Sequence, residues 1–367
     1  MKFSLLPLCE LATIRYGKNQ SQVVCEKSEY PIYGTGGLMG YATRPLYTKP
    51  SVLIGRKGTI GRVKYVNHPF WTVDTLFYTE INELKVLPHY LYYVMSRLDL
   101  NAYNEGTTIP SLRTGTLNRL EFNIPSLEYQ KKVLSVLEPL DERIELNNAI
   151  NNNLQQQTEA LFAEYFLSFT DIPLGWRKGS LLDIAEYNNG LAMQKFRPKE
   201  GELGLPVLKI KELRQGFCDV DSELCSPSIR SDYIVHDGDV IFSWSGSLLV
   251  DFWCGGDCGL NQHLFKVTSS HYEPWFYYLW TNYHLAKFVA IAADKATTMG
   301  HIKREDLAKS EVLIPSADDY KKIGAAMRPL LTMLINNRIE SKQLAGIRDS
   351  LLPKLMNGKI DISKVEI

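Results

Sequence analysis

The chain has 367 residues, of which 45% are hydrophobic and 22% charged, a balance typical of a soluble globular protein with room for two domains. Its 41 basic and 41 acidic side chains cancel, which argues against a protein that coats nucleic acid through bulk charge. No apolar run approaches the roughly 20 residues of a membrane span, and the start of the chain lacks a signal peptide, so we expect a cytoplasmic protein with free thiols and no membrane partner.

The first half reads as a mixed α/β segment. It opens with a short helix-like stretch at residues 7–12 and continues through short strands separated by glycines. An aromatic amphipathic helix is expected to begin at Pro88, because a helix tolerates proline in its first turn. Its aromatic stripe favours core packing over a platform for stacked bases. Runs of β-branched and aromatic residues bounded by Gly, Asn and Asp predict strands at 30–34, 51–55, 62–66 and 75–78.

Two loops of the first half combine cations with small polar residues. In residues 53–62, LIGRKGTIGR, a glycine recurs every third position, which lets the backbone approach a partner closely. Arginine can contact guanine with two hydrogen bonds, and arginine or lysine can pair with phosphate. A solvated hairpin turn is the competing interpretation. The loop 105–113 places threonine hydroxyls beside Arg113, and residues 39–120 hold ten basic and five acidic side chains, which together point to an anionic partner.

A long helix is expected at residues 126–166, and it recurs 190 positions later at 316–356. An Ile-Pro pair precedes both copies. Each copy carries a heptad seam whose apolar positions alternate steps of four and three, with the polar residues Asn147 and Asn337 at matching places. Such a seam winds one helix around another, and polar seam residues fix the register. The repeat therefore predicts that the two helices pack on each other.

A proline lies inside each copy, at Pro139 and Pro329. Proline removes one backbone hydrogen bond and clashes with the preceding turn. Each copy is therefore either kinked or divided into a short helix and a long one.

The second half repeats the order of elements of the first. A short helix is expected at 181–186 and an aromatic helix from Pro274, with strands at 206–210, 239–243 and 263–266. In place of the GRKGTIG loop it reads FSWSGS at 242–247. The predicted fold class is α+β, with two pseudo-repeated globules separated by an antiparallel pair of long coiled-coil-like helices. The predicted segments are 1–127, 128–169, 170–317 and 318–367.

Motifs of catalysis are missing from the sequence. It has no GxxxxGK[ST] nucleotide loop, no Asn/Asp-Pro-Pro-aromatic methyltransferase loop and no recognisable nucleophile. Asp74 followed by Glu83-Leu84-Lys85 has the outline of a metal-dependent nuclease, but so short a pattern arises often by chance. Cys254, Cys258 and His263 could supply three zinc ligands, although buried free thiols are the favoured interpretation. We predict a non-catalytic chain without a metal site.

Taken together, the motifs resemble the specificity subunit of type I restriction–modification systems over essentially the whole chain. They are VLIGRKGTIG, WTVDTLFY, GTTIPSLRTG, NIPSLEYQKKV, LNQHLFKV and SLLPKLMNGKIDI. The resemblance implies two target-recognition domains that each read half of a split, asymmetric sequence in the major groove of double-stranded DNA. The helices would space the half-sites and dock two modification subunits. S-adenosylmethionine, Mg and ATP are then expected on the modification and restriction subunits, and no cofactor on this chain.

The expected contact residues follow from the loops and the resemblance together. Lys131, Lys132, Lys321 and Lys322 are expected on the outer, docking face of the helices. A stand-alone DNA-binding regulator and a metal-dependent nuclease using Asp74 stay as alternatives. DNA contacts are predicted at Arg56, Lys57, Thr59, Arg62, Lys64, Thr107, Thr108, Ser111 and Arg113 in the first half, and at Lys209, Lys211, Ser243, Trp244, Ser245, Thr297, Thr298 and Lys303 in the second.

Overall fold

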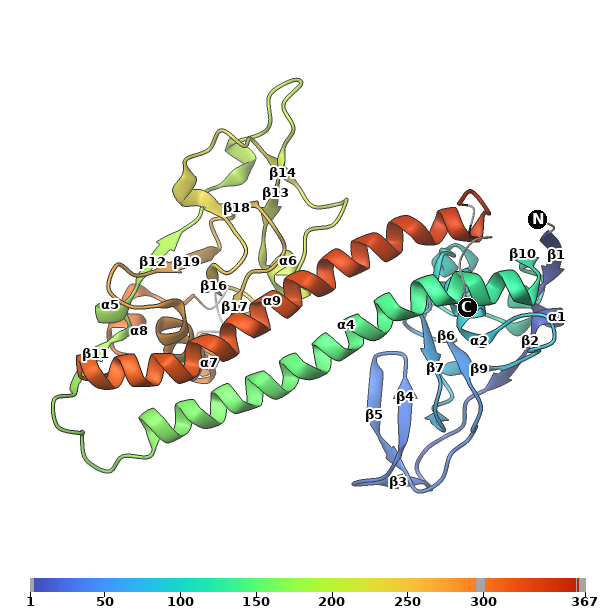
Figure 1. Cartoon of the computed structure of the whole chain (residues 1–367), viewed down its shortest axis with the longest axis horizontal. Helices are drawn as coiled ribbons and strands as arrows, with labels where there is room; N and C mark the ends of the chain where they lie inside the picture. Colours follow the sequence, from blue (N-terminus) through green and yellow to red (C-terminus); the bar gives the residue numbers. More distant parts are fainter. Residues whose placement is uncertain (1–2, 295–300, 361, 363–367) are drawn as a thin grey trace. The chain divides into compact units, whose positions relative to one another are not determined.

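The chain divides into two compact units (Figure 1). The computed structural model describes residues 3–294, 301–360 and 362. One unit comprises residues 1–141 and 346–367, and the other comprises residues 142–345. Both long helices, α4 (Leu127–Phe162) and α9 (Ala317–Met356), contribute a segment to each unit. The predicted α+β class with two similar globules and a helix pair is confirmed, whereas the four predicted segment boundaries stay a prediction.

The described residues of the first unit form three sheets, two of four strands and one of two. One four-stranded sheet has the strand order β2-β9-β6-β7 and is antiparallel throughout, the second has the order β3-β5-β4-β8, and β1 pairs with β10. The elements are β1 (Phe3–Pro7), α1 (Leu8–Leu11), β2 (Ala12–Tyr16), β3 (Val24–Cys25), β4 (Tyr30–Gly34), β5 (Gly37–Ala42), β6 (Ser51–Gly55), β7 (Val63–Val66), β8 (Trp71–Thr72), β9 (Leu76–Ile81), α2 (Pro88–Ser96), η1 (Leu100–Tyr103), α3 (Thr114–Leu117) and β10 (Glu121–Pro125).

The second unit repeats this plan. Its sheet β12-β19-β16-β17 matches β2-β9-β6-β7, and the β11–β20 pair matches β1–β10. A second four-stranded sheet has the order β14-β13-β18-β15. The elements are η2 (a π-helical turn, Ala163–Leu167), β11 (Arg177–Ser180), α5 (Leu181–Ile184), β12 (Glu186–Asn189), η3 (Met193–Lys195), β13 (Leu205–Leu208), α6 (Ile210–Gln215), β14 (Leu224–Cys225), η4 (Ser231–Tyr233), β15 (Ile234–Val235), β16 (Val240–Ser243), β17 (Leu249–Phe252), β18 (Cys258–Leu260), β19 (Leu264–Thr268), α7 (Pro274–Asp294), α8 (Arg304–Ala308) and β20 (Glu311–Ile314).

One predicted strand is too long at its C-terminal end. The strand expected at 206–210 ends at Leu208, and α6 begins at Ile210. The backbone N–H of Lys209 donates to a Glu212 carboxylate oxygen at 3.2 Å, which starts the helix. The strand was predicted from the β-branched residues of this stretch, and the capping signal was overlooked.

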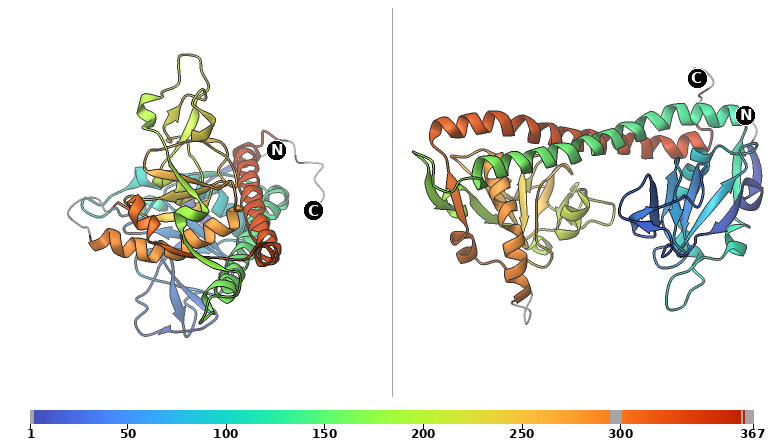
Figure 2. Two further views of the ribbon diagram at one scale, coloured as in Figure 1. Left: turned by 90° about the vertical axis from the view of Figure 1, so that its left-hand side faces the viewer. Right: turned by 90° about the horizontal axis from the view of Figure 1, so that it is seen from below.

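The seam residues of α4 and α9 face each other, as predicted. Within each unit the two helices lie side by side and antiparallel, because rising positions on α4 meet falling positions on α9 (Figures 1 and 2). Asn147 is fully buried, and its amide donates to Glu340 at 2.8 Å and to Ser341 at 3.3 Å. The Asn337 amide donates to Asn151 at 3.0 Å. Polar seam residues therefore pair across the interface and fix its register.

The prolines neither begin nor divide the long helices. α4 runs without interruption through Pro139 and α9 through Pro329. Just before Pro139, Val133 and Leu137 are completely buried on the seam. Packing of this turn compensates for the hydrogen bond that proline removes.

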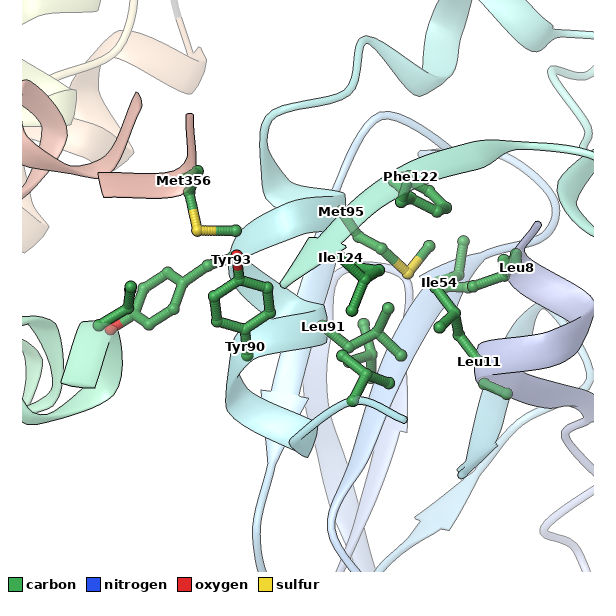
Figure 3. Close-up of a cluster of buried hydrophobic side chains, with 14 of the residues drawn as sticks. Leu8, Leu11, Ile54, Tyr90, Leu91, Tyr93, Met95, Phe122, Ile124 and Met356 are labelled. Carbon is green, nitrogen blue, oxygen red and sulfur yellow. The ribbon is translucent and has the colours of Figure 1, made fainter. Parts of the chain in front are cut away.

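The aromatic helix of the first unit belongs to its core. Tyr90, Leu91 and Met95 of α2 pack among Leu8, Leu11 and Ile54, and Met356 of α9 joins the same cluster (Figure 3). In the second unit Trp275 and Phe276 of α7 are buried in the equivalent cluster. The aromatic stripes therefore pack inward, as the sequence predicted. None of the helices in the described ranges is both long and apolar enough to cross a membrane.

A buried histidine on α7 predicts a pH-dependent stability for the second unit. His284 is 7% exposed, and its Nε2 donates to the Glu311 carbonyl oxygen at 2.8 Å. Burial lowers the imidazole pKa below its ordinary value of 6.5, because charge is disfavoured away from water. As the pH falls through 6.5 the unfolded chain binds the proton first, so the free energy of unfolding should decrease.

Denaturant unfolding at several pH values checks this expectation. His284→Gln should flatten the pH dependence below pH 6.5, and the exposed His271→Gln should retain it. The same slope in both variants would contradict a role for His284.

Candidate nucleic-acid interface

Two loops of the first unit meet at the end of β6. A single β-bridge joins Lys57 to Ser111, and the Leu112 N–H donates to the Arg56 carbonyl oxygen at 3.0 Å. The Gly58 N–H donates to the Pro110 carbonyl oxygen at 2.9 Å. We call this arrangement the loop junction. It brings together the predicted contact residues Lys57 and Ser111, which lie 54 positions apart, and it leaves Lys57, Thr59, Thr107, Thr108 and Arg113 exposed.

Glycine at the end of β6 is a steric requirement. A β-carbon on Gly55 would lie 2.1 Å from the Thr59 carbonyl oxygen, which no side chain can tolerate. Gly58 adopts a φ of +85°, a conformation that favours glycine. These two positions let the chain turn tightly enough to present Arg56 and Lys57.

We expect Gly55→Ala to destabilise the chain by about 1–3 kcal/mol, because the loop must move to make room for the methyl group. Gly36→Ala is the matched control, since a β-carbon there meets nothing within 4 Å, and its effect should stay within about 0.5 kcal/mol. Urea unfolding of both variants measures the difference. Equal effects would contradict the steric role of Gly55.

The cations of the first junction are held in defined positions. Arg56 Nη1 donates to the Asp74 carbonyl oxygen at 2.7 Å, and the guanidinium carbon lies 5.0 Å from the centre of the Tyr16 ring. Arg113 pairs with Glu105 at 3.3 Å, with its side chain 75% exposed. Arg56 is therefore positioned before binding and loses less entropy when it meets a ligand, whereas Arg113 must first leave Glu105.

Asn104 closes the second loop of the junction, and sequence reasoning missed it. Its Oδ1 accepts the N–H groups of Gly106 and Ser111, each at 2.9 Å. Asparagine often bonds the backbone two residues on, so its place before Glu105-Gly106 was the available signal.

Arg62 and Lys64 lie beyond the junction, towards β7. Both are exposed, and the Lys64 ammonium lies 4.4 Å from the centre of the Tyr33 ring. These two residues stay predicted contacts, separate from the junction itself.

The second unit builds the same junction from different side chains. A single β-bridge joins Ser245 to His301, and the Ile302 N–H donates to the Trp244 carbonyl oxygen at 3.1 Å. Ser243 and Ser245 are buried, and the Ser243 hydroxyl donates to the Ser247 carbonyl oxygen at 2.9 Å. These two hydroxyls support the loop from inside. Lys303 is exposed just before α8, whereas Thr297 and Thr298 lie outside the described residues.

Two predicted lysines of the second unit are engaged by carboxylates. Lys209 pairs with Glu223 at 2.6 Å, and Lys211 pairs with Asp219 at 2.9 Å. The hydrogen bond from Lys211 lowers the pKa of Asp219 to about 2. Each lysine must leave a carboxylate before it can contact an anion, which lowers the gain from that contact.

His263 is the main residue of this site that was not among the contacts predicted from the sequence. Its Nδ1 lies 3.3 Å from Ser245 Oγ, and its Nε2 lies 3.4 Å from Gln262 Nε2. The Trp244 ring lies 6.2 Å from the His263 ring and 5.3 Å from the His301 ring, centre to centre. The Gln-His pair in LNQHLFKV, just before a strand, was the available signal.

The metal-site candidates are not assembled. The part of the chain that is described holds no cluster of three His, Cys, Asp or Glu side chains able to bind a metal ion. Lys85 of the nuclease-like pattern pairs with Glu10 at 2.5 Å. Cys254 and Cys258 are free and buried in different hydrophobic clusters, and burial raises the pKa of Cys254 to about 12. The burial of both thiols in separate clusters agrees with the interpretation that favoured buried thiols.

The paired lysines lie in the second turn of each long helix. Lys131 and Lys321 are exposed, and Lys322 lies 3.8 Å from Asp319. Lys132 is half-buried. The predicted docking role of these four residues stays a prediction.

The chain is similar to known proteins along most of its length. A family model described as the type I restriction modification DNA specificity domain matches residues 2–156 and again 173–344. The type I restriction enzyme MjaIX specificity subunit of Methanocaldococcus jannaschii is 26% identical over 349 residues, which cover 87% of this chain and 80% of that protein. The HindI specificity subunit of Haemophilus influenzae is 20% identical over 385 residues, covering 82% and 84% of the two chains.

A solved structure has the same fold. The crystal structure of the type I restriction–modification S subunit from M. genitalium matches with a TM-score of 0.66 at 16% identity, and the match covers 97% of this chain and 96% of that one. Each matched segment contains one copy of the loop junction with its sheets and part of one long helix. The chain therefore belongs to the family of type I restriction–modification DNA specificity subunits, with two copies of the specificity domain.

Proposed function

We propose that this chain is the sequence-specific DNA-binding subunit of a type I restriction–modification complex and that it reads a bipartite, asymmetric target. The observation that carries the proposal is the loop junction, which the two units build with the same backbone contacts and different side chains. A repeated scaffold with different exposed groups suits two different half-sites, because base edges are distinguished by their donor and acceptor patterns.

In this proposal the chain directs partner subunits and performs no chemistry itself. Two modification subunits methylate the DNA that the chain selects, and restriction subunits join them for cleavage. S-adenosylmethionine, Mg and ATP bind on those partners.

The helix pair is proposed to set the spacing of the half-sites and to dock the modification subunits. Its seam is closed by apolar and paired polar residues, which leaves the outer faces for partners. Lys131, Lys132, Lys321 and Lys322 are the docking candidates on those faces. The first unit supplies Arg56, Lys57, Thr59, Thr107, Thr108, Ser111 and Arg113 as DNA contacts, with Arg62 and Lys64 beyond them.

Co-expression with the cognate modification subunit tests the proposal. In a host without its own adenine methylation, methylation-sensitive sequencing should reveal one split motif, and the purified chain alone should neither methylate nor cut DNA. Failure to form a complex with the modification subunit would contradict the proposal. Tight site-specific binding that needs no partner would favour a stand-alone regulator, and magnesium-dependent cleavage lost in Asp74→Ala would favour a nuclease.

A further inference from the structure

The two loop junctions can be compared residue by residue. Arg56 corresponds to Trp244, because the same backbone hydrogen bond joins Arg56 to Leu112 and Trp244 to Ile302, at 3.0 and 3.1 Å. The strand pairs agree, since Gly55 faces Leu76 on β9 as Ser243 faces Leu264 on β19. The two residues before these strands therefore correspond as well, Asp74-Thr75 in one unit and Gln262-His263 in the other.

The second junction lacks the two cations that the first presents on its β6 loop, although Lys303 stands where the first has Arg113. Trp244 replaces Arg56 and Ser245 replaces Lys57, and Ser245 is only 3% exposed. A guanidinium suited to guanine is therefore absent from this corner of the second junction. Gln262 and His263, both half-buried, lie beside this corner instead. An amide and an imidazole would recognise a base through other hydrogen bonds than a guanidinium does.

The hydrogen bonds around His263 fix the orientation of the Gln262 amide. The amide nitrogen of Gln262 can only donate, so His263 Nε2 accepts from it at 3.4 Å. His263 Nδ1 then carries the proton and donates to Ser245 Oγ at 3.3 Å. This relay uses one N–H of the Gln262 amide. The other N–H and the Oε1 atom have no partner among the described residues.

The second N–H and the Oε1 atom of the Gln262 amide therefore offer a ligand one hydrogen-bond donor beside one acceptor. Adenine presents the complementary pair in the major groove, with N7 as acceptor and the N6 amino group as donor. We infer that Gln262 is a specificity-determining residue of the second unit, that it selects an adenine in the half-site read by that unit, and that His263 is its positioning residue. The inference rests on the proposed function.

The test is the methylation motif written by the assembled complex of this chain and its modification subunit. Gln262→Ala should make one adenine position of one half-site degenerate and leave the other half-site unchanged. Discrimination at that position should fall by about ten- to a hundredfold, measured as competition between duplexes that differ at that base. Gln262→Glu, which keeps the shape and offers only acceptors, should shift the preference towards cytosine, whose N4 amino group donates.

The positioning role of His263 has its own readout. His263→Ala should relax the same position as Gln262→Ala, and His263→Asn, which can still accept from the amide, should restore part of the selectivity. His271→Ala is the matched control, because this exposed histidine follows β19 at the end remote from His263. Thermal unfolding and copurification with the modification subunit establish that each variant is folded.

An unchanged motif in both Gln262 variants would overturn the inference, and so would complete loss of methylation by an intact complex, which no single base contact explains. Relaxation at one position by Gln262→Ala together with His263→Ala supports it. A wild-type complex that writes no split motif would instead overturn the proposed function.

Discussion

The double variant Arg56→Ala, Lys57→Ala is expected to lose selection at one half-site and to keep it at the other. Arg56 is oriented by the Asp74 carbonyl oxygen and the Tyr16 ring, and Lys57 is exposed on the same loop. A good bidentate contact to a base is worth about 1–3 kcal/mol, so discrimination at the contacted position should fall about 5- to 150-fold. Methylation-sensitive sequencing of DNA exposed to the complex reads both halves at once.

The exposed Arg97, at the end of α2, is the matched control for that variant. Arg97→Ala removes a cation from the same unit and should leave both half-sites unchanged. Salt dependence separates a base contact from a phosphate contact, because loss of one phosphate contact reduces the slope of log affinity against log salt by about 1. Equal loss of selection at both half-sites would refute the proposal that each unit recognises one half-site independently.

Asp141→Ala is expected to lower the free energy of unfolding by about 2–4 kcal/mol. Asp141 accepts a hydrogen bond from the Tyr93 hydroxyl at 2.5 Å and one from Arg348 Nη1 at 2.6 Å. Its side chain is 17% exposed and that of Arg348 is 26% exposed. The variant therefore leaves the buried Tyr93 phenol without its acceptor and the largely buried Arg348 guanidinium with the exposed Asp349 in place of Asp141, which costs more than the bonds themselves contributed.

Asp349→Ala is an internal control for the same arginine. Asp349 also pairs with Arg348, at 2.8 Å, but its side chain is 64% exposed, so water replaces it readily. We expect a change below about 1 kcal/mol in chemical denaturation. A cost equal to that of Asp141→Ala would contradict the claim that burial makes Asp141 important.

The sequence predicted those features that depend on local pattern. The heptad seam identified Val133, Leu137 and Asn147 as buried, because its spacing reports which face of a helix meets a partner. Strands β4 and β6 have the predicted bounds, since β-branched runs between glycines resolve clearly.

Features that depend on distant partners were harder to predict. The carboxylates that engage Lys209 and Lys211 lie 14 and 8 positions further along the chain, so the sequence showed two cations where the structure has two ion pairs. His263 was considered only as a possible zinc ligand, because Cys254 and Cys258 are close in sequence, whereas in the fold the two thiols lie in separate hydrophobic clusters. Whether a proline interrupts a helix likewise depends on packing around it, as at Pro139.

The first unit is built from two separate segments of the chain, and this affects how it can fold during synthesis on the ribosome. Its core contains Leu352, Leu355 and Met356 beside Leu8 and Tyr90, and the Tyr129 hydroxyl donates to the Leu355 carbonyl oxygen at 2.9 Å. The second unit, by contrast, is one uninterrupted stretch of chain. Domains usually fold in the order in which they are translated. Here the first unit is expected to lack part of its core until α9 has been synthesised. Most of this unit is made first, yet it should complete its folding after the second unit.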